Sequence, residues 1–187
     1  MSPERECPAA SQECPLLPEM EQLRERCRVL EELSYVDSLT GMYNFRYLQR
    51  ALDMEIERTR RTRLPTSLIM ADLDYFRNIN TKFGHEAGNI VLAEVGRILR
   101  ESIRLIDIPC RYGGEEFALI LPSTSHVQAV KIAERLRASI ASLPIDIGVQ
   151  TVTVTGSFGV ASIRHYDNIT VNEFIRRADG FLYQAKE

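Results

Sequence analysis

Hydrophobic residues recur along this chain in two spacings, one typical of amphipathic helices and one typical of short strands. Helical spacing predicts helices over 45–62, 87–103, 127–143 and 171–182. Short apolar runs predict strands in "TSLIMADLDYF", "IPCRY", "EFALILP" and "VQTVTVTGSFGVAS", the last of which alternates like paired strands. Because strands and helices follow one another without an internal repeat, the pattern predicts one mixed α/β domain over residues 36–187.

The N-terminal part of the chain has a different pattern. Prolines among small and acidic residues predict a flexible leader over residues 1–19, since such a composition buries little surface. Over residues 20–35 the apolar positions are separated by three and four residues, and they are Met20, Leu23, Cys27 and Leu30. This spacing indicates either a coiled-coil stalk that joins two copies or a single amphipathic helix resting on the domain.

Composition excludes several classes of protein. The chain has 187 residues, a net charge of -3 and a pI near 5.7, which argues against a general nucleic-acid or membrane-surface binder. Its four cysteines form no Cys-x-x-Cys pair, so neither a zinc site nor a disulfide framework is predicted. No apolar stretch approaches the roughly 20 residues that span a bilayer, and the N-terminus lacks a secretion signal. We therefore expect a cytoplasmic chain with reduced thiols, no nucleic-acid partner and no membrane segment.

One basic run stands out in this acidic chain. Arg58, Arg60, Arg61 and Arg63 lie at the end of the helix predicted over 45–62. Basic residues in a last turn complement the helix dipole, and we favour this interpretation over a phosphate-binding patch.

Carboxylates gather at two predicted strand ends. Asp72 and Asp74 end one strand, while Glu115 and Glu116 follow Gly113-Gly114, a dipeptide that supplies the positive φ angles of a tight hairpin. If the two strands are neighbours, Asp72 and Glu115 meet at one end of a sheet. Two carboxylates and a backbone carbonyl such as that of Leu73 suit Mg²⁺, which completes its shell with water and substrate phosphates. The alternative is that these are solvated acids at strand ends.

The segment "RYGGEEF" together with "DSLTGMYN", "DLDYFRNINTKFGHEAGN", "RLID" and "ADGFLYQAK" resembles the GGDEF family of bacterial diguanylate cyclases, over nearly all of residues 37–187. The resemblance implies a palm-like central sheet of about five strands, mainly antiparallel, wrapped by helices. It also implies second-messenger synthesis, in which a homodimer joins two GTP into cyclic di-GMP with release of pyrophosphate. Two Mg²⁺ ions, or Mn²⁺ in their place, would serve each half-site.

The same resemblance assigns roles to residues. Asp72, Glu115 and the Leu73 carbonyl would hold the metal ions, and Glu116 would order a metal or deprotonate the attacking 3′-hydroxyl. The substrate-binding residues would be the glycine hairpin, the backbone of "FR" in "DLDYFRNIN", a lysine near the end and two base-reading asparagines. They are Gly113, Gly114, Phe76, Arg77, Lys186, Asn80 and Asn89. Without the family, Asn80 could simply cap a turn and Lys186 could be a solvated lysine.

"RLID" allows two interpretations as well. Arg104 and Asp107 could be a surface ion pair at i, i+3. The resemblance instead implies the RxxD site at which cyclic di-GMP inhibits its own synthesis, with Arg135 in support.

Three departures from the family pattern set further expectations. Phe45 stands where the family usually has arginine, which removes a probable partner of Asp37 or a neighbour. The chain stops at Glu187, ahead of the stretch where the family usually has a further phosphate-binding arginine, so either the chain is truncated or that contact is absent. Asn89 replaces the usual base-reading aspartate, so ATP could enter and yield cyclic GMP-AMP.

The hypothesis that competes with the cyclase is a catalytically silent domain that binds nucleotide or cyclic di-GMP and signals by contact.

Overall fold

The computed structural model describes residues 20–24, 26, 30 and 35–187, and the chain divides into the units Met1–Ser34 and Tyr35–Glu187. Residues 20–24, 26 and 30 are helical. The predicted leader, 1–19, lies outside the described residues, as does much of the predicted helix over 20–35, so both interpretations stay predictions. Among the described residues, no helix combines the length and apolar character needed to cross a membrane.

The second unit is built on an antiparallel sheet of four strands in the order β2-β3-β1-β6. These strands are β1 (Thr66–Leu73), β2 (Ile108–Gly113), β3 (Glu116–Leu121) and β6 (Gly156–Ile163). A separate small sheet pairs β4 (Ile145–Asp146) with β5 (Thr151–Val152). The mixed α/β fold with a mainly antiparallel sheet is confirmed, with four strands in the main sheet where about five were expected.

One predicted pairing is wrong. The segment that alternates like paired strands contains β5 and β6, but β5 pairs with β4 and β6 pairs with β1. The physical reason is burial, because β1 is buried along its full length and offers β6 a register of eight residue pairs. If β6 instead folded back to pair with the two-residue strand β5, it would bury far less apolar surface.

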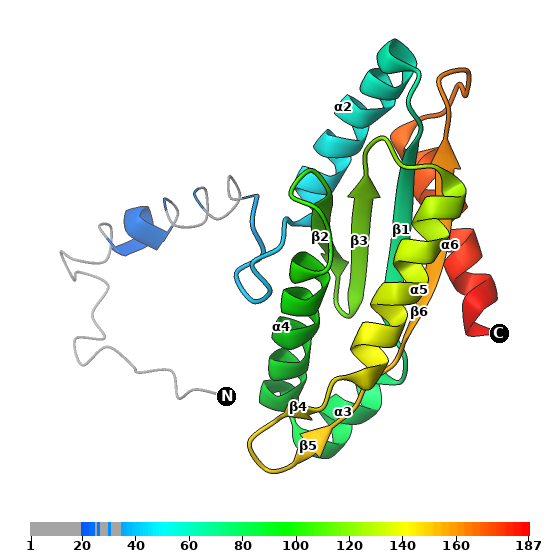
Figure 1. The fold of residues 1–187 in the computed structure, drawn as a ribbon. Coiled ribbons are helices and arrows are strands. Elements are labelled where there is room, and N and C mark those ends of the chain that lie inside the picture. The colour runs from blue at the N-terminus through cyan, green and yellow to red at the C-terminus, as the bar shows by residue number, and fades with distance from the viewer. Residues whose placement is uncertain (1–19, 25, 27–29, 31–34) are drawn as a thin grey trace. The chain divides into compact units, whose positions relative to one another are not determined.

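Helices cover both faces of the main sheet (Figure 1), with α4 and α5 on one side and α2 and α6 on the other. Their bounds are α2 (Phe45–Thr62), α3 (Phe76–Phe83), α4 (His85–Glu101), α5 (His126–Ser142) and α6 (Val171–Lys186). The sequence analysis missed α3, a helix of eight residues in which Phe76 alone is buried, so its apolar period is too weak to detect.

Side chains of the central strands alternate between two cores, as the two-residue repeat of a strand requires. In β1, Ile69, Ala71 and Leu73 enter the core under α4 and α5. Leu68 and Met70 enter the core shared with α2 and α6. With both faces filled, polar groups of β1 can reach solvent only at its ends, and its C-terminal end carries Asp72.

Candidate active site

Two strand ends bring the predicted carboxylates together. Asp72 in β1 lies directly opposite Glu116, the first residue of β3. Glu115 immediately precedes Glu116, and the Glu115 carbonyl accepts a hydrogen bond from the Leu73 N–H at 3.3 Å. The strands predicted to be neighbours are therefore neighbours, and Asp72, Leu73, Glu115 and Glu116 lie at one end of the sheet.

The glycine turn next to them is open. Gly113 ends β2, and Gly114 has a φ of +47°, so only one of the two glycines uses the left-handed region that the sequence predicted for the dipeptide. A Cβ atom added at either glycine would meet nothing within 4 Å. The space above this backbone is therefore free for a ligand that approaches closely.

Arg111 holds this turn in place. Its Nη2 and Nε donate to the Gly114 carbonyl at 2.8 and 3.1 Å, and its Nη1 lies 3.1 Å from the Asp37 carboxylate. Asp37 thus has an ion-pair partner in Arg111, whereas an arginine at position 45, which Phe45 replaces, could have supplied another. Phe45 instead packs edge-on against Tyr112, with ring centroids 5.1 Å apart.

The Asp37 carboxylate should contribute to stability in a pH-dependent way. Burial alone would raise its pKa, but hydrogen bonds from Thr40 and the charge of Arg111 outweigh burial and hold the pKa below its ordinary value of 3.8. A depressed folded-state pKa stabilises the fold above the unfolded pKa, and this contribution is lost as pH falls through the folded value.

We therefore expect Asp37→Asn to lower the free energy of unfolding by about 1.5 to 3 kcal/mol at pH 7, the worth of a hydrogen bond to a charged group. The difference from the unsubstituted protein should shrink as pH falls below 3.8. Urea unfolding at several pH values measures it, with Asp53→Asn, at an exposed position on α2, as the control. A difference that stays constant down to pH 2 would show that the carboxylate charge is not its source.

Lys186, from the last turn of α6, reaches the same end of the sheet. Its Nζ lies 2.9 Å from Asp72 Oδ1, and both residues line a cavity of about 470 Å³. Asp74 also lines it, but its two oxygens accept from the hydroxyls of Thr155 and Ser157 at 2.7 and 2.8 Å. Asp74 thus braces the segment before β6, whereas Asp72 faces a cation.

Negative charge is in excess around Glu116. Burial raises its pKa first, the charges of Asp72 and Asp179 raise it further, and Lys186 opposes them. Asp179, on α6, was quoted only as part of "ADGFLYQAK" and received no role, because sequence spacing does not show that α6 returns to this strand end.

This donor set fits a magnesium site completed by substrate. Within the described part of the chain, no group of three or more His, Cys, Asp or Glu residues could hold a metal ion. Asp72, Glu115 and the Leu73 carbonyl would supply only part of an octahedral shell, and Mg²⁺ ordinarily takes the remainder from water and phosphates. A divalent cation would also relieve the excess charge that raises the pKa of Glu116.

The predicted base-reading residues lie where α3 meets α4. Asn80 Oδ1 is 2.0 Å from the position that a Cβ on Gly88 would occupy, so the Asn80 side chain packs directly on the bare backbone of Gly88 and would have to move for a larger residue. Asn89 follows Gly88 on α4 and is exposed. Phe76 begins α3 and is buried, while Arg77 beside it is exposed.

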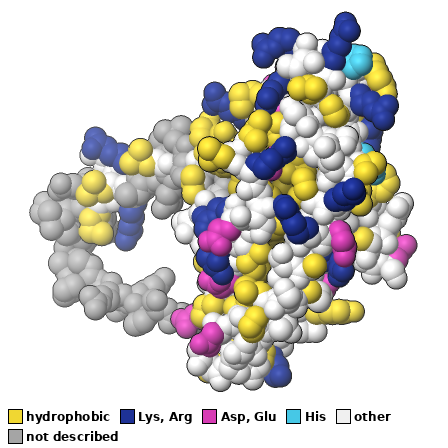
Figure 2. Space-filling model, in the orientation of Figure 1, with side chains coloured by type: hydrophobic (Ala, Val, Ile, Leu, Met, Phe, Trp, Pro, Cys, Tyr) yellow, Lys and Arg dark blue, Asp and Glu magenta, His cyan; other side chains and the backbone are white. Residues whose placement is uncertain are grey.

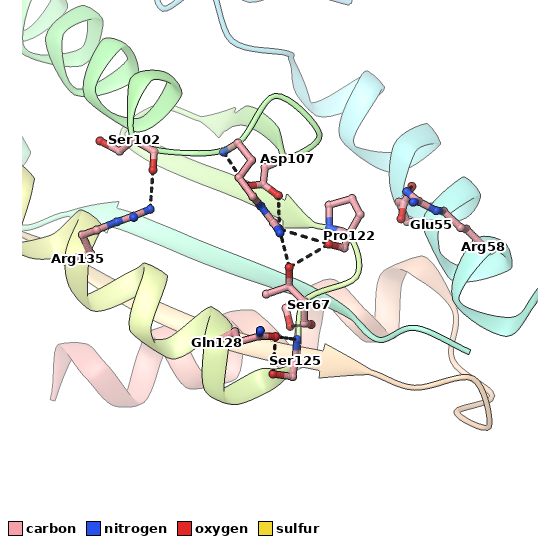
Figure 3. Close-up of polar contacts among 11 residues, drawn as sticks. Glu55, Arg58, Ser67, Ser102, Asp107, Pro122, Ser125, Gln128 and Arg135 are labelled. Carbon is pink, nitrogen blue, oxygen red and sulfur yellow. Dashed lines mark hydrogen bonds and ion pairs between the residues drawn. The ribbon is translucent and has the colours of Figure 1, made fainter. Parts of the chain in front are cut away.

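The predicted inhibitory site forms a separate cluster. Arg104 Nη2 lies 2.8 Å from Asp107 Oδ1 and also donates to Thr124 Oγ1 at 2.7 Å. Arg135 Nη2 donates to the Ser102 carbonyl at 2.6 Å, and a cavity of about 300 Å³ joins the cluster (Figure 3). The Asp107 side chain is only 1% exposed, so this is not a simple surface ion pair. The Arg104–Asp107 cluster lies at the start of β2, and the length of β2, roughly 17 Å, separates it from the glycine turn.

Comparison with known proteins connects this geometry to a family. The profile described as "Diguanylate cyclase, GGDEF domain" matches residues 34–187. The response regulator PleD of Caulobacter vibrioides is 40% identical over 157 residues, which are 83% of this chain and 34% of PleD. The chain thus spans about a third of such curated relatives.

Solved structures agree with this match. Diguanylate cyclase SiaD of Pseudomonas aeruginosa, solved in complex with its activator SiaC, has a TM-score of 0.78 and 36% identity over 90% of this chain and 64% of SiaD. The active GGEEF domain of a diguanylate cyclase from Vibrio cholerae has a TM-score of 0.71 and 33% identity over 76% of this chain and 90% of that domain. Sheet order, glycine turn and sequence identity thus lead to one conclusion: the chain belongs to the GGDEF family of diguanylate cyclases.

Proposed function

We propose that this domain is a diguanylate cyclase that condenses two GTP into cyclic di-GMP. In each half-reaction a 3′-hydroxyl oxygen attacks the α-phosphate of the other nucleotide, and pyrophosphate leaves. The observation that carries the proposal is the Glu115-Glu116 turn, held in register with Asp72 and beside Lys186. The similarity to the active GGEEF domain from Vibrio cholerae supports activity over a silent role. Because GTP is the substrate, we place the activity in the cytoplasm.

Each group around the turn has a task in this proposal. The open backbone at Gly113 and Gly114 lets the triphosphate lie close, and the Lys186 ammonium would bind its phosphate oxygens. The N-terminal N–H groups of α3, at Phe76 and Arg77, would bind further phosphate oxygens. Asp72, Glu115 and the Leu73 carbonyl would hold two Mg²⁺ ions, which when bound would withdraw charge from the α-phosphate.

Glu116 is the proposed proton acceptor. Glu116 carries a carboxylate directly opposite Asp72, at the strand end where the proposed metal ligands lie, so it is within the region that the attacking hydroxyl would reach. It would take the proton of the attacking 3′-hydroxyl as the new ester bond forms.

Two copies of the chain are needed, because one half-site holds one nucleotide and the attacking hydroxyl belongs to the other. A helix over residues 20–35 that pairs with its counterpart would raise the effective concentration of the two half-sites. The homodimer is therefore part of the proposal.

The decisive experiment is incubation of the protein with Mg²⁺ and GTP, followed by mass spectrometry of the products. Formation of cyclic di-GMP, lost in the presence of EDTA, supports the cyclase. Binding of GTP without any cyclic product would favour the silent nucleotide-binding alternative.

We further propose that cyclic di-GMP inhibits the enzyme at Arg104, Asp107 and Arg135. Arg104→Ala is expected to raise the inhibition constant by about tenfold or more, since a hydrogen bond to a charged group is worth about 1.5 to 3 kcal/mol. The initial rate should change little, because the cluster is remote from Asp72. Progress curves with added cyclic di-GMP measure both quantities.

Arg97→Ala is the matched control for this prediction. Arg97 is an exposed arginine on α4 that pairs with Glu94 and Glu101. An inhibition constant unchanged by Arg104→Ala would leave the Arg104 cluster with a structural role alone.

A further inference from the structure

A further cavity lies at the end of the sheet opposite the candidate active site. This cavity, the distal pocket, has a volume of about 410 Å³, and the polar residues of its lining include Ser125, His126, Arg164, Tyr166, Asp167 and Arg177. These residues come from the start of α5, from the loop between β6 and α6, and from α6 itself. Thr66 pairs with Ile163 at this end of the sheet, whereas Asp72 pairs with Ser157 at the other. The two ends of β1 are roughly 23 Å apart.

The positive charge of the distal pocket is only partly compensated. Hydrogen bonds from Thr170 and the charges of Arg176 and Arg177 lower the pKa of Glu173, so this carboxylate interacts with Arg177 without forming an ion pair. Among the described residues, the Arg177 guanidinium makes no hydrogen bond or ion pair, and the Arg164 guanidinium donates only to the Tyr166 hydroxyl, at 2.8 Å. Asp167 is the one carboxylate in the lining, and it accepts from the backbone N–H of Arg164 at 2.8 Å, not from either guanidinium. Two arginines therefore keep free donors in a concave site.

The surroundings add to this positive potential. Arg60, at the end of α2, reaches Asn168 in the β6–α6 loop at 3.5 Å, although its Nη1 is already paired with Glu57. Arg61 and Arg63 follow it in the chain. Dark blue side chains accordingly gather at the end of the molecule formed by the end of α2 and the β6–α6 loop (Figure 2). This is unusual in a chain of net charge -3, and complementing the dipole of α2 does not account for Arg164 and Arg177 on other elements.

The remaining groups of the distal pocket also suit an anion. Helix α5 begins at His126, so the positive dipole end of a 17-residue helix lies at the lining, where a capping box between Ser125 and Gln128 already occupies part of the terminal N–H groups. His126 Nδ1 lies 3.3 Å from Ser162 Oγ, which orients the ring. Phe181 and the ring of Tyr166 supply apolar surface beside the arginines.

We propose that the distal pocket binds the phosphate group of a small phosphorylated molecule. Guanidinium groups bind phosphate oxygens through paired hydrogen bonds, and the volume falls in the range of about 300 to 1,000 Å³ that small-molecule sites occupy. A concave lining with aromatic surface favours a free molecule over the headgroup layer of a membrane. This site goes beyond the cyclase proposal, because it needs neither GTP turnover nor a metal ion.

Binding can be tested without activity. Inorganic phosphate is titrated into the isotopically labelled chain in EDTA at constant ionic strength, and backbone amide shifts are followed by NMR. We expect saturable shifts over residues 125–128 and 164–167, distinct from any response at Lys186. Arg164→Gln and Arg177→Gln should each weaken phosphate binding at these amides about tenfold or more.

Arg137→Gln is the matched control, because Arg137 is an exposed arginine of α5 already paired with Glu134, and its loss should leave the affinity unchanged. Arg177→Lys tests whether positive charge alone is sufficient. Lysine keeps the charge but lacks the paired N–H donors of a guanidinium, so this variant should still bind phosphate more weakly. Equal affinity in all four variants, or shifts that chloride reproduces, would overturn the proposal. A further result would also overturn it: the protein cosediments with vesicles of phosphatidylcholine and phosphatidic acid but shows no saturable amide shifts with phosphate. The basic surface around the distal pocket would then bind a lipid surface.

Discussion

Glu115→Gln is expected to lower the rate of cyclic di-GMP formation by more than about a hundredfold while leaving the fold intact. The Glu115 side chain belongs to the open turn, and its backbone carbonyl, which bonds Leu73, is unaffected by the substitution. A neutral amide cannot replace an anionic oxygen as a ligand of Mg²⁺, and the α-phosphate then loses its main charge compensation. Initial rates with Mg²⁺ and GTP measure the effect, and circular dichroism confirms the fold.

Asp72→Asn tests the other proposed metal ligand and has a second consequence. It should abolish turnover for the same reason, and it also removes the partner of the Lys186 ammonium, which lies 2.9 Å away. Glu101→Gln, an exposed change on α4, is the control for both substitutions and should leave the rate unchanged. A rate within a few-fold of the unsubstituted protein in either variant would remove that residue from the metal site.

Much of the fold could be predicted from hydrophobic spacing. The helix predicted over 45–62 is α2, and the glycine turn joins β2 to β3 as expected. These signals are local, because a helix of 18 residues or a hairpin is encoded within its own segment. The partner of β6 is decided by burial against a strand roughly 90 residues earlier in the chain, and the local pattern of alternation carries no information on that choice.

The candidate site divides in the same way. The motifs identify Asp72, Glu115 and Glu116, and neighbouring strands bring them together. The sequence could not show that Asp179 acts on Glu116, since that depends on how α6 packs against the sheet. It also could not show the ion pair of Asp37 with Arg111, because these residues are 74 positions apart.

The second large effect expected concerns the base that the enzyme accepts, and it rests on Asn89. The side chain is exposed on α4, one residue after Gly88, against which Asn80 packs. We infer that the two asparagines face the same base. Aspartate at position 89 would accept both the N1 and the N2 hydrogens of guanine, whereas a carboxamide offers one acceptor oxygen and a donor NH₂.

Adenine presents an acceptor at N1 beside a donor at N6, and a carboxamide matches that pattern in full. We therefore expect Asn89 to weaken the binding of guanine and to admit adenine, with Asn80 still biasing the site toward one base. An unmade hydrogen bond in a closed site costs about 1 to 3 kcal/mol, which corresponds to about a five- to hundredfold change in selectivity. With equal GTP and ATP, we expect some cyclic GMP-AMP among the products.

The test is the product ratio from mixed nucleotides, measured by mass spectrometry for the unsubstituted protein and for Asn89→Asp. The aspartate variant should shift the products toward cyclic di-GMP, because it restores the second acceptor. Asn78→Asp, an exposed change on α3, introduces the same charge away from α4 and should leave the ratio unchanged. If cyclic di-GMP is the sole product and Asn89→Asp changes nothing, Asn89 must accept from guanine through its oxygen while a water molecule satisfies the remaining donor, and base selection is then set elsewhere.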